Sequence, residues 1–203
     1  MRNPRWWSLV WLVGISVSPS AAQNALLNPD FGVDVAGWQT FLGSLDLDPM
    51  HEDADGCPES SSGRLVAASQ SGPEFLGLLQ ATDSCLDVAP LQEVWIDATL
   101  WLRSAGFVAV GLILLEYTDD ACTTFLDPPV QTAIELSVGS TPEAEHLSVT
   151  TSAGVESVGL QIDTGAIVPN ALLLDRLYLG TAERVFADDF EGGSTCRWSA
   201  GAI

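Results

Sequence analysis

The chain has 203 residues, a formal net charge of −20 and 7 cationic residues, all of them arginine. A surface this acidic repels phosphate backbones and anionic membranes, which excludes nucleic acid as a partner. A mature chain of about 180 residues is long enough for one domain with a sizeable core, and the many carboxylates suit a Ca²⁺-containing medium outside the cell.

The first 22 residues have the three parts of a secretory signal peptide. Arg2 and Arg5 form a basic start, Trp6–Val17 is a short apolar run, and Ser20–Ala22 is a small-residue cleavage site. A membrane-spanning helix needs about 20 apolar residues, and this run is shorter. We therefore expect cleavage before Gln23 and a secreted or periplasmic protein with no membrane insertion.

After the signal peptide, short apolar stretches alternate with turn residues, and no amphipathic helix of useful length is present. Asn28–Asp30 predicts a turn, and residues 44–63 form a polar, acidic stretch that predicts a loop. Short strands at regular spacing are typical of an all-β sandwich or jelly roll. We expect one jelly-roll β-sandwich domain over residues 23–181 and a separate tail over 182–203. Besides a central pair, the expected strands are one that opens at Gly37 and Trp38, then residues 63–69, 74–81, 131–138, 145–151, 155–162 and 171–179.

The central pair lies in residues 91–117, which predict two strands joined by a turn at 104–106. The second strand, Phe107–Tyr117, is apolar on both faces as far as Glu116, so we expect it to be covered on both sides. The two strands are predicted to form the middle of the sandwich. In the first strand the period of two places one apolar set on a single face: Val94, Ile96, Ala98, Leu100 and Leu102.

Four cysteines follow the signal peptide. An even number in an exported protein favours two disulfides, with three possible connectivities. We favour Cys85–Cys122, because these two flank the central strand pair, and take Cys57–Cys196 as the second bridge. The absence of C-x-x-C spacing disfavours a zinc site.

Four phrases resemble, in their order and spacing, the galactose-binding-like jelly-roll modules found beside cellulases and xylanases. They are residues 24–38 (NALLNPDFGVDVAGW), 61–69 (SSGRLVAAS), 78–104 (LLQATDSCLDVAPLQEVWIDATLWLRS) and 171–179 (ALLLDRLYL). The resemblance runs through most of residues 24–180. It implies a carbohydrate-binding module whose partner is a polysaccharide or surface glycan.

In that family the N-terminal segment and an Asp in the last strand often build a structural Ca²⁺ site. Asp175 matches the last-strand position, and Asp30 is the candidate from the N-terminal segment. The family usually has Glu after the Phe, whereas this chain has Gly32, so Asp30 or a backbone oxygen would replace that ligand. A carboxylate in a buried strand needs a metal or an Arg partner, and Arg176 is expected to point to the opposite face.

The tail contains FADDFEGGSTCRWSA, residues 186–200. It resembles a short motif that ends many exported bacterial proteins. A small added strand pair and a surface-export tag are both open as its role.

The predicted glycan site is the second face of the first central strand. Sugars stack on aromatic rings and bond their hydroxyls to Asp, Arg and Gln. Trp95 and Trp101 lie six residues apart on one strand, about 20 Å, so one sugar cannot touch both. The alternative is that both rings pack inside, as Trp38 is expected to do. The predicted ligand-binding residues are Trp95, Asp97, Trp101 and Arg103, with Tyr117, Gln161 and Asp163 lining the same cleft.

The sequence contains few residues that could serve as catalytic groups. His51 and His146 are the only histidines, and neither lies in a nucleophile or zinc motif. Residues 51–56 (HEDADG) depart from a Ca²⁺ loop at their first position, and Ser62 stands where the closing Glu should be, so we expect a solvated acidic loop. The sequence therefore favours a monomeric, non-enzymatic module. A structural or cell-surface adhesion sandwich and, less favoured, a glycoside hydrolase with paired carboxylates stay open.

Overall fold

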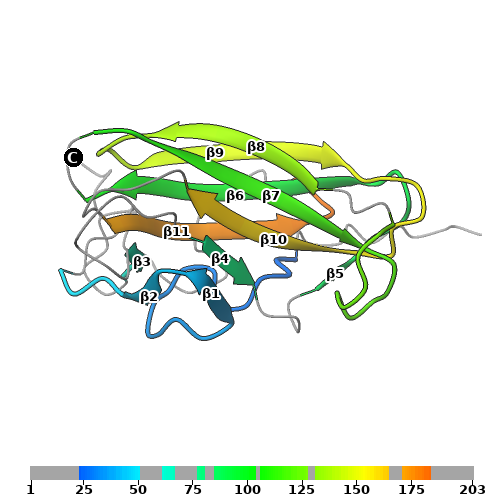
Figure 1. Ribbon diagram of the computed structural model, residues 1–203, viewed down its shortest axis with the longest axis horizontal. Coiled ribbons are helices and arrows are strands. Elements are labelled where there is room, and N and C mark those ends of the chain that lie inside the picture. Colours follow the sequence, from blue (N-terminus) through cyan, green and yellow to red (C-terminus); the bar gives the residue numbers. More distant parts are fainter. Residues whose placement is uncertain are drawn as a thin grey trace, which may run out of the picture.

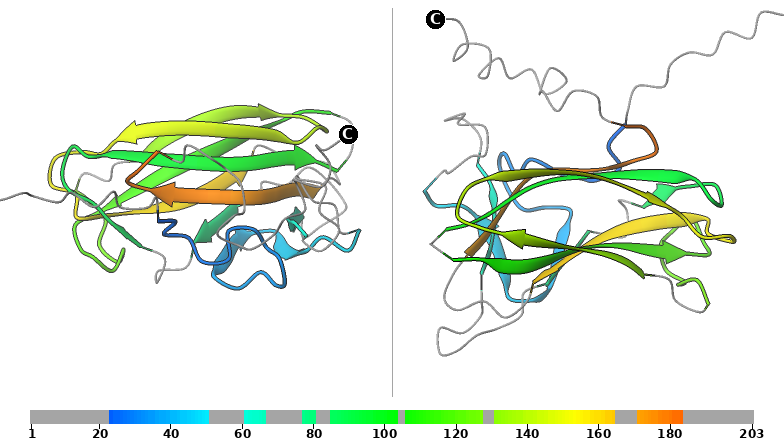
Figure 2. Two further views of the ribbon diagram at one scale, coloured as in Figure 1. Left: turned by 180° about the vertical axis from the view of Figure 1, so that it is seen from behind. Right: turned by 90° about the horizontal axis from the view of Figure 1, so that it is seen from above.

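The computed structural model describes residues 23–50, 61–66, 77–80, 85–103, 106–127, 131–164 and 171–183. These residues form two antiparallel β-sheets packed face to face, and Figure 2 shows the two layers from above (Figures 1 and 2). The fold is an all-β jelly-roll sandwich, as predicted. Within these ranges no helix has the length and apolarity to cross a membrane.

The two sheets have six and five strands. Sheet A has the order β1 (Trp38–Leu42), β4 (Gly77–Gln80), β10 (Ser157–Thr164), β7 (Val108–Tyr117) and β8 (Gln131–Val138), with β5 (Leu86–Asp87) paired to the beginning of β10. Sheet B has the order β2 (Ser44–Leu47), β3 (Gly63–Val66), β11 (Ala171–Gly180), β6 (Glu93–Leu102) and β9 (Glu143–Thr150).

The central pair, β6 and β7, occupies the middle of the sandwich, as expected, but each strand lies in a different sheet. β6 pairs with β11 and β9, whereas β7 pairs with β10 and β8. The connection after β6 therefore crosses from one layer to the other, so the two strands face each other across the core. Their core-facing side chains form one apolar cluster, and burying each large one contributes about 1.5–3 kcal/mol.

Two strands were not expected from the sequence. β2 falls in the stretch predicted as a loop, because its charged and polar residues mask a short alternation. Leu45 and Leu47 pack against the core, while Ser44 and Asp46 are exposed. β5 is only two residues long, too short to give a period.

Two further expectations are confirmed. Trp38 is buried in the core, 5.8 Å from the ring of Phe31, and its indole N–H donates to the carbonyl of Asn28. The disulfide Cys85–Cys122 is present. The signal peptide, the 51–56 loop, the Cys57–Cys196 pair and the 186–200 motif lie outside the described residues.

The N-terminal segment runs beside β11, as the view from behind in Figure 2 shows. Ala25 N–H donates to the carbonyl of Leu179, and Leu177 N–H donates to that of Pro29. β11 has a bulge here, between Asp175 and Tyr178, and Arg176 has a φ of 53°. The bulge breaks the strict alternation from which the direction of Arg176 was predicted.

Candidate functional site

The predicted glycan-binding residues lie on two different sheets and do not line one cleft. Their neighbours along each strand belong to the core, so these side chains face away from it. Because β6 and β7 lie in opposite layers, the expectation of a single groove is corrected to two separate surfaces. Trp95, Asp97, Trp101 and Arg103 lie on the sheet B side, whereas Tyr117, Gln161 and Asp163 lie on the sheet A side.

On the sheet B side, Trp101 is only 5% exposed. Its cross-strand neighbour, Leu173 of β11, is fully buried as well. The guanidinium of Arg103 forms an ion pair with the buried carboxylate of Asp48. A ring this buried offers no face to a sugar, so the structure favours the packing alternative for Trp101.

Trp95 and Asp97 contact His146 of β9. The rings of Trp95 and His146 stack with centroids 5.0 Å apart, and Nδ1 of His146 lies 2.5 Å from Oδ1 of Asp97. The hydrogen bond to Asp97 raises the pKa of His146, and Glu183, 3.5 Å from Nε2, raises it further. His146 thus already occupies one face of Trp95 and one oxygen of Asp97.

On the outer face of sheet A, two glycines flank the carboxylate of Asp163. We call Gly77, Asp163 and Gly111 the Asp163 strip. Asp163 of β10 is paired with Gly77 of β4 on one side and with Gly111 of β7 on the other. A Cβ atom added to Gly111 would lie 2.6 Å from Oδ1 of Asp163, so this carboxylate extends over Gly111. Glu135 of β8 is paired with Gly111 from the other side and is exposed. The glycine therefore forms a floor between two carboxylates.

The surroundings of Asp163 disfavour the charged form of its carboxyl group. Partial burial raises the pKa of this carboxyl, the amide of Gln161 lowers it, and the charge of Glu135 raises it again, with a net upward shift. The amide nitrogen of Gln161 lies 3.5 Å from Oδ2 of Asp163. Carboxyls perturbed by burial and a like charge gather at functional sites. The Asp163 strip is therefore the candidate binding site.

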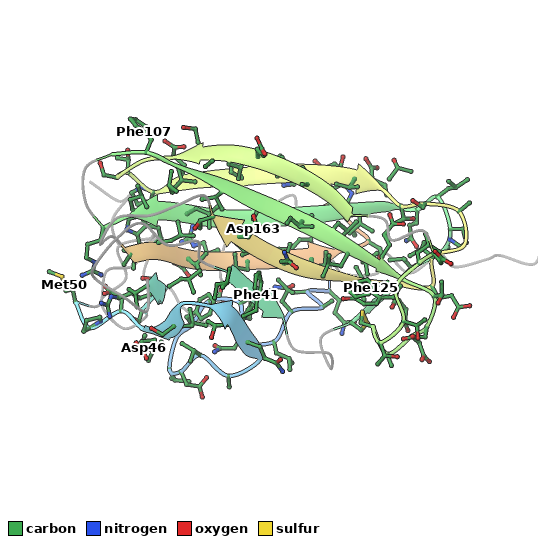
Figure 3. The ribbon with its side chains drawn as sticks, in the orientation of Figure 1. Phe41, Asp46, Met50, Phe107, Phe125 and Asp163 are labelled. Atoms are coloured by element: carbon green, nitrogen blue, oxygen red, sulfur yellow. A yellow bond between two sulfur atoms is a disulfide. The ribbon has the colours of Figure 1, made fainter. Side chains whose placement is uncertain are left out.

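Phe41 supplies an aromatic ring to the same face. Its ring covers Gly77, whose missing side chain leaves room for it, and the residue is 50% exposed. Figure 3 shows Phe41 and Asp163 on the face that the view looks onto. A bulge between Thr40 and Leu42 interrupts the β1–β4 register at Phe41. Phe41 lies three residues after the core residue Trp38, so simple alternation already points this ring outward, although it was not singled out from the sequence.

Tyr117 was expected to line the same cleft as Trp95, but it lies on the sheet A side and is only 5% exposed. Burial raises the pKa of its phenol, and the charge of Asp119 raises it further. Phe125 stacks on it with ring centroids 4.8 Å apart and is 45% exposed. The aromatic surface at this end of the sheet therefore belongs to Phe125 rather than to Tyr117. Neither Phe125 nor Glu135 was singled out from the sequence, although alternation with Ile134 and Leu136 predicts the outward direction of Glu135.

The predicted Ca²⁺ ligands lie near the bulge of β11. Asp175 is buried and its Oδ1 accepts a hydrogen bond from the N–H of Arg176, while Asp30 follows the backbone that pairs with Leu177. Ca²⁺ takes 6–8 oxygen ligands. Across the part of the chain that the structure describes, no three His, Cys, Asp or Glu residues converge on a metal position. The calcium assignment stays a prediction.

The described residues thus form a two-layer jelly-roll sandwich. No protein-family model and no curated protein matches the chain by sequence.

Solved structures match by shape. A family 16 carbohydrate-binding module matches with a TM-score of 0.53 and 13% identity, over 77% of this chain and 99% of that one. TmCBM61, solved with β-1,4-galactotriose, matches with a TM-score of 0.55 and 12% identity, over 79% and 99%. The CBM22-1–GH10 part of the Clostridium thermocellum xylanase Xyn10B, solved with xylohexaose, matches with a TM-score of 0.53 and 12% identity, over 77% and 28%. At these identities the likeness establishes the fold alone.

Proposed function

We propose that this protein is a secreted, non-catalytic carbohydrate-binding module that binds a polysaccharide or surface glycan on the outer face of sheet A. One observation carries the proposal: the Asp163 carboxylate extends over Gly111 beside Gln161, with the exposed ring of Phe41 on the same face. A sugar needs an aromatic surface for its C–H face and polar groups for its hydroxyls. The matched carbohydrate-binding modules of known structure support the same reading.

The test is retention of the protein on insoluble polysaccharides such as cellulose, xylan and galactan. We expect retention on at least one polymer, lost in Phe41→Ala and in Asp163→Asn. Phe107→Ala is the matched control, because Phe107 is 78% exposed and its ring lies over Gly139, just after β8, rather than over Gly77 or Gly111. Retention that survives both site variants, or is lost only in Trp95→Ala, would move the site to sheet B.

The stability of Asp163→Asn separates a binding role from a structural one. Because the folded-state pKa of Asp163 is raised, the folded state binds a proton more readily than the unfolded chain does. Stability then falls as pH rises from the unfolded pKa through the folded one, and the penalty persists at neutral pH. Asp163→Asn removes this penalty, so we expect a melting temperature at neutral pH no lower than that of the unmodified protein, together with lost binding. A clear drop in melting temperature would make Asp163 a structural residue.

The structural Ca²⁺ role of Asp30 and Asp175 is part of the proposal. If the ion binds the folded chain, added Ca²⁺ raises the melting temperature and a chelator lowers it. Asp175→Asn should abolish that response. A melting temperature that ignores both Ca²⁺ and the chelator would remove the metal from the proposal, and light scattering in the same samples tests the expected monomer.

The two alternatives predict different results. A structural or adhesion sandwich would be folded yet retained on no polysaccharide. A glycoside hydrolase would release reducing sugar, with Asp163 and Glu135 as its pair. Those two residues lie two strands apart, about 10 Å between backbones, and the partial burial of Asp163 beside an exposed Glu135 is the one observation that favours this activity. Reducing-sugar release that is lost in Glu135→Gln would establish it.

A further inference from the structure

The loop that follows β7 is fixed at several points. Thr118 N–H donates to the carbonyl of Thr124 at 2.9 Å and closes the neck of the loop. The carboxylate of Asp119 accepts from the N–H of Ala121 at 3.0 Å and from the N–H and hydroxyl of Thr123, both at 2.9 Å. These bonds, led by that from the Thr123 N–H, hold the pKa of Asp119 well below its usual range. The loop is therefore held by its own hydrogen bonds.

The disulfide Cys85–Cys122 ties this loop to the segment that leads into β5. Both sulfur atoms lie within 3.4 Å of the hydroxyl of Ser157, which is fully buried and donates to the carbonyl of Asp119 at 2.5 Å. The cross-link thus reaches the first residue of β10 and joins the loop to sheet A.

The loop carries one exposed aromatic side chain in its described part, Phe125. Its ring is stacked on Tyr117 with an angle of 23° between the planes, so one face is covered and the other is turned outward. An exposed, immobilised aromatic face is costly in water and is what a sugar ring stacks upon. Because its position is already fixed, binding a ligand there requires little further ordering.

Phe125 is in line with the Asp163 strip. It bridges to Tyr117, whereas Glu135 on β8 pairs with Gly111, six residues along β7. Phe125 and Glu135 therefore lie on the same side of β7, about 20 Å apart, with the exposed Ala133 between them. Figure 3 labels Phe41, Asp163 and Phe125 at separate places, with Phe125 farther to the right than the other two.

We propose that Phe125 is a second aromatic subsite, held in place by the Cys85–Cys122 loop, which binds a sugar ring several units away from the one at Asp163. The inference rests on the proposed function. A short oligosaccharide at the Asp163 strip cannot reach Phe125, because about 20 Å exceeds the length of one or two rings. Phe125 therefore adds affinity only for longer oligosaccharides, and only while the Cys85–Cys122 disulfide is intact.

The experiment is calorimetric titration with a soluble oligosaccharide series, from disaccharide to hexasaccharide, of the polymer that retains the protein. We expect Phe125→Ala to weaken hexasaccharide binding by roughly threefold to tenfold, the range of one aromatic contact, and to leave the shortest bound oligosaccharide unchanged. Phe107→Ala is the matched exposed-Phe control and should change neither. The double variant Cys85→Ser/Cys122→Ser should reproduce the Phe125→Ala loss, and combining the two should add little.

A second readout does not depend on comparing affinities. Phe125→Trp keeps an aromatic face, and its indole fluorescence should shift on hexasaccharide binding and not with the shortest ligand, in a difference spectrum against the unmodified protein. Equal affinities of Phe125→Ala and the unmodified protein for every chain length would overturn the inference while the proposed function stands. If the unmodified protein binds no polymer, the proposed function fails first and the inference fails with it.

Discussion

Gly111 offers a way to disturb the candidate site without removing any of its chemical groups. In Gly111→Ala the new Cβ would lie 2.6 Å from Oδ1 of Asp163, whereas ordinary contacts begin at 3.4 Å. The carboxylate must therefore retreat by about 0.8 Å, the difference between these two distances. Under the proposed function, a carboxylate displaced by this much would lose its hydrogen bond to the sugar hydroxyl.

The expected loss follows from the strength of that bond. A hydrogen bond to a charged group contributes about 1.5–3 kcal/mol, which corresponds to a roughly tenfold to 150-fold weaker Kd. Folding should be little affected. Replacing glycine with alanine lowers the conformational entropy of the unfolded chain, and this stabilisation offsets the cost of the local crowding. The assay is calorimetric titration with the oligosaccharide that the unmodified protein binds, with the melting temperature measured in parallel.

The matched control is Gly32→Ala. Gly32 is exposed, and a Cβ there would meet no atom within 4 Å, so this variant makes the same chemical change with no steric consequence. We expect its Kd to equal that of the unmodified protein. If Gly111→Ala also binds with unchanged Kd while Asp163→Asn does not bind, the position of the carboxylate over Gly111 does not matter and the reasoning is refuted.

Three further outcomes are expected. Replacing Cys85 and Cys122 with Ser opens a cross-link of 37 residues, which should cost about 4 kcal/mol in the chain-entropy model and lower the melting temperature by roughly 8–15 °C; a shift of a degree or two would contradict it. The raised pKa of His146 means that its contact with Asp97 adds stability below the unfolded pKa, which is lost as pH rises through the folded one. Melting curves across pH 5–9 should show that loss in the unmodified protein and not in His146→Ala. Trp101→Ala should destabilise the fold by about 3–5 kcal/mol in denaturant titration, and glycan binding measured on the folded fraction should persist.

Period-two alternation predicted the strands well where apolar residues are dense. β6, β7 and β11 fall within about two residues of the expected ranges, because a strand inside a sheet buries long runs of Leu, Ile and Val. β8, at the edge of sheet A, was found from the alternation of Ile134 and Leu136. β2 was missed because only Leu45 and Leu47 mark it among polar residues. A short alternation at a sheet edge carries too few apolar residues to stand out from a loop.

Alternation could not predict which residues of different strands share a surface. The period of two tells which side chains of one strand face the same way, and it gave the outward direction of Trp101 and Gln161 correctly. It does not tell to which sheet each strand belongs, and the short turn after β6 suits a change of layer as well as a hairpin. Trp101 also shows that a side chain directed away from the core can still be buried. Phe41 is three residues from the core residue Trp38, so alternation gives its outward direction but not its neighbour Gly77, while Phe125 lies in a loop and follows no period.

The pairing of Ala25 with Leu179 has a mechanical consequence. The described chain enters and leaves the sandwich beside this one hydrogen bond, so tension applied through both ends would act on the antiparallel contact between the N-terminal segment and β11 from its open end. Such a contact opens in sequence, first at the bonds that Asn24 and Ala25 make to Leu177 and Leu179, and then at the bond from Leu177 to Pro29. The N-terminal segment would therefore peel away at low force before the layers separate, and the Asp163 strip on the opposite sheet would still be intact at that stage.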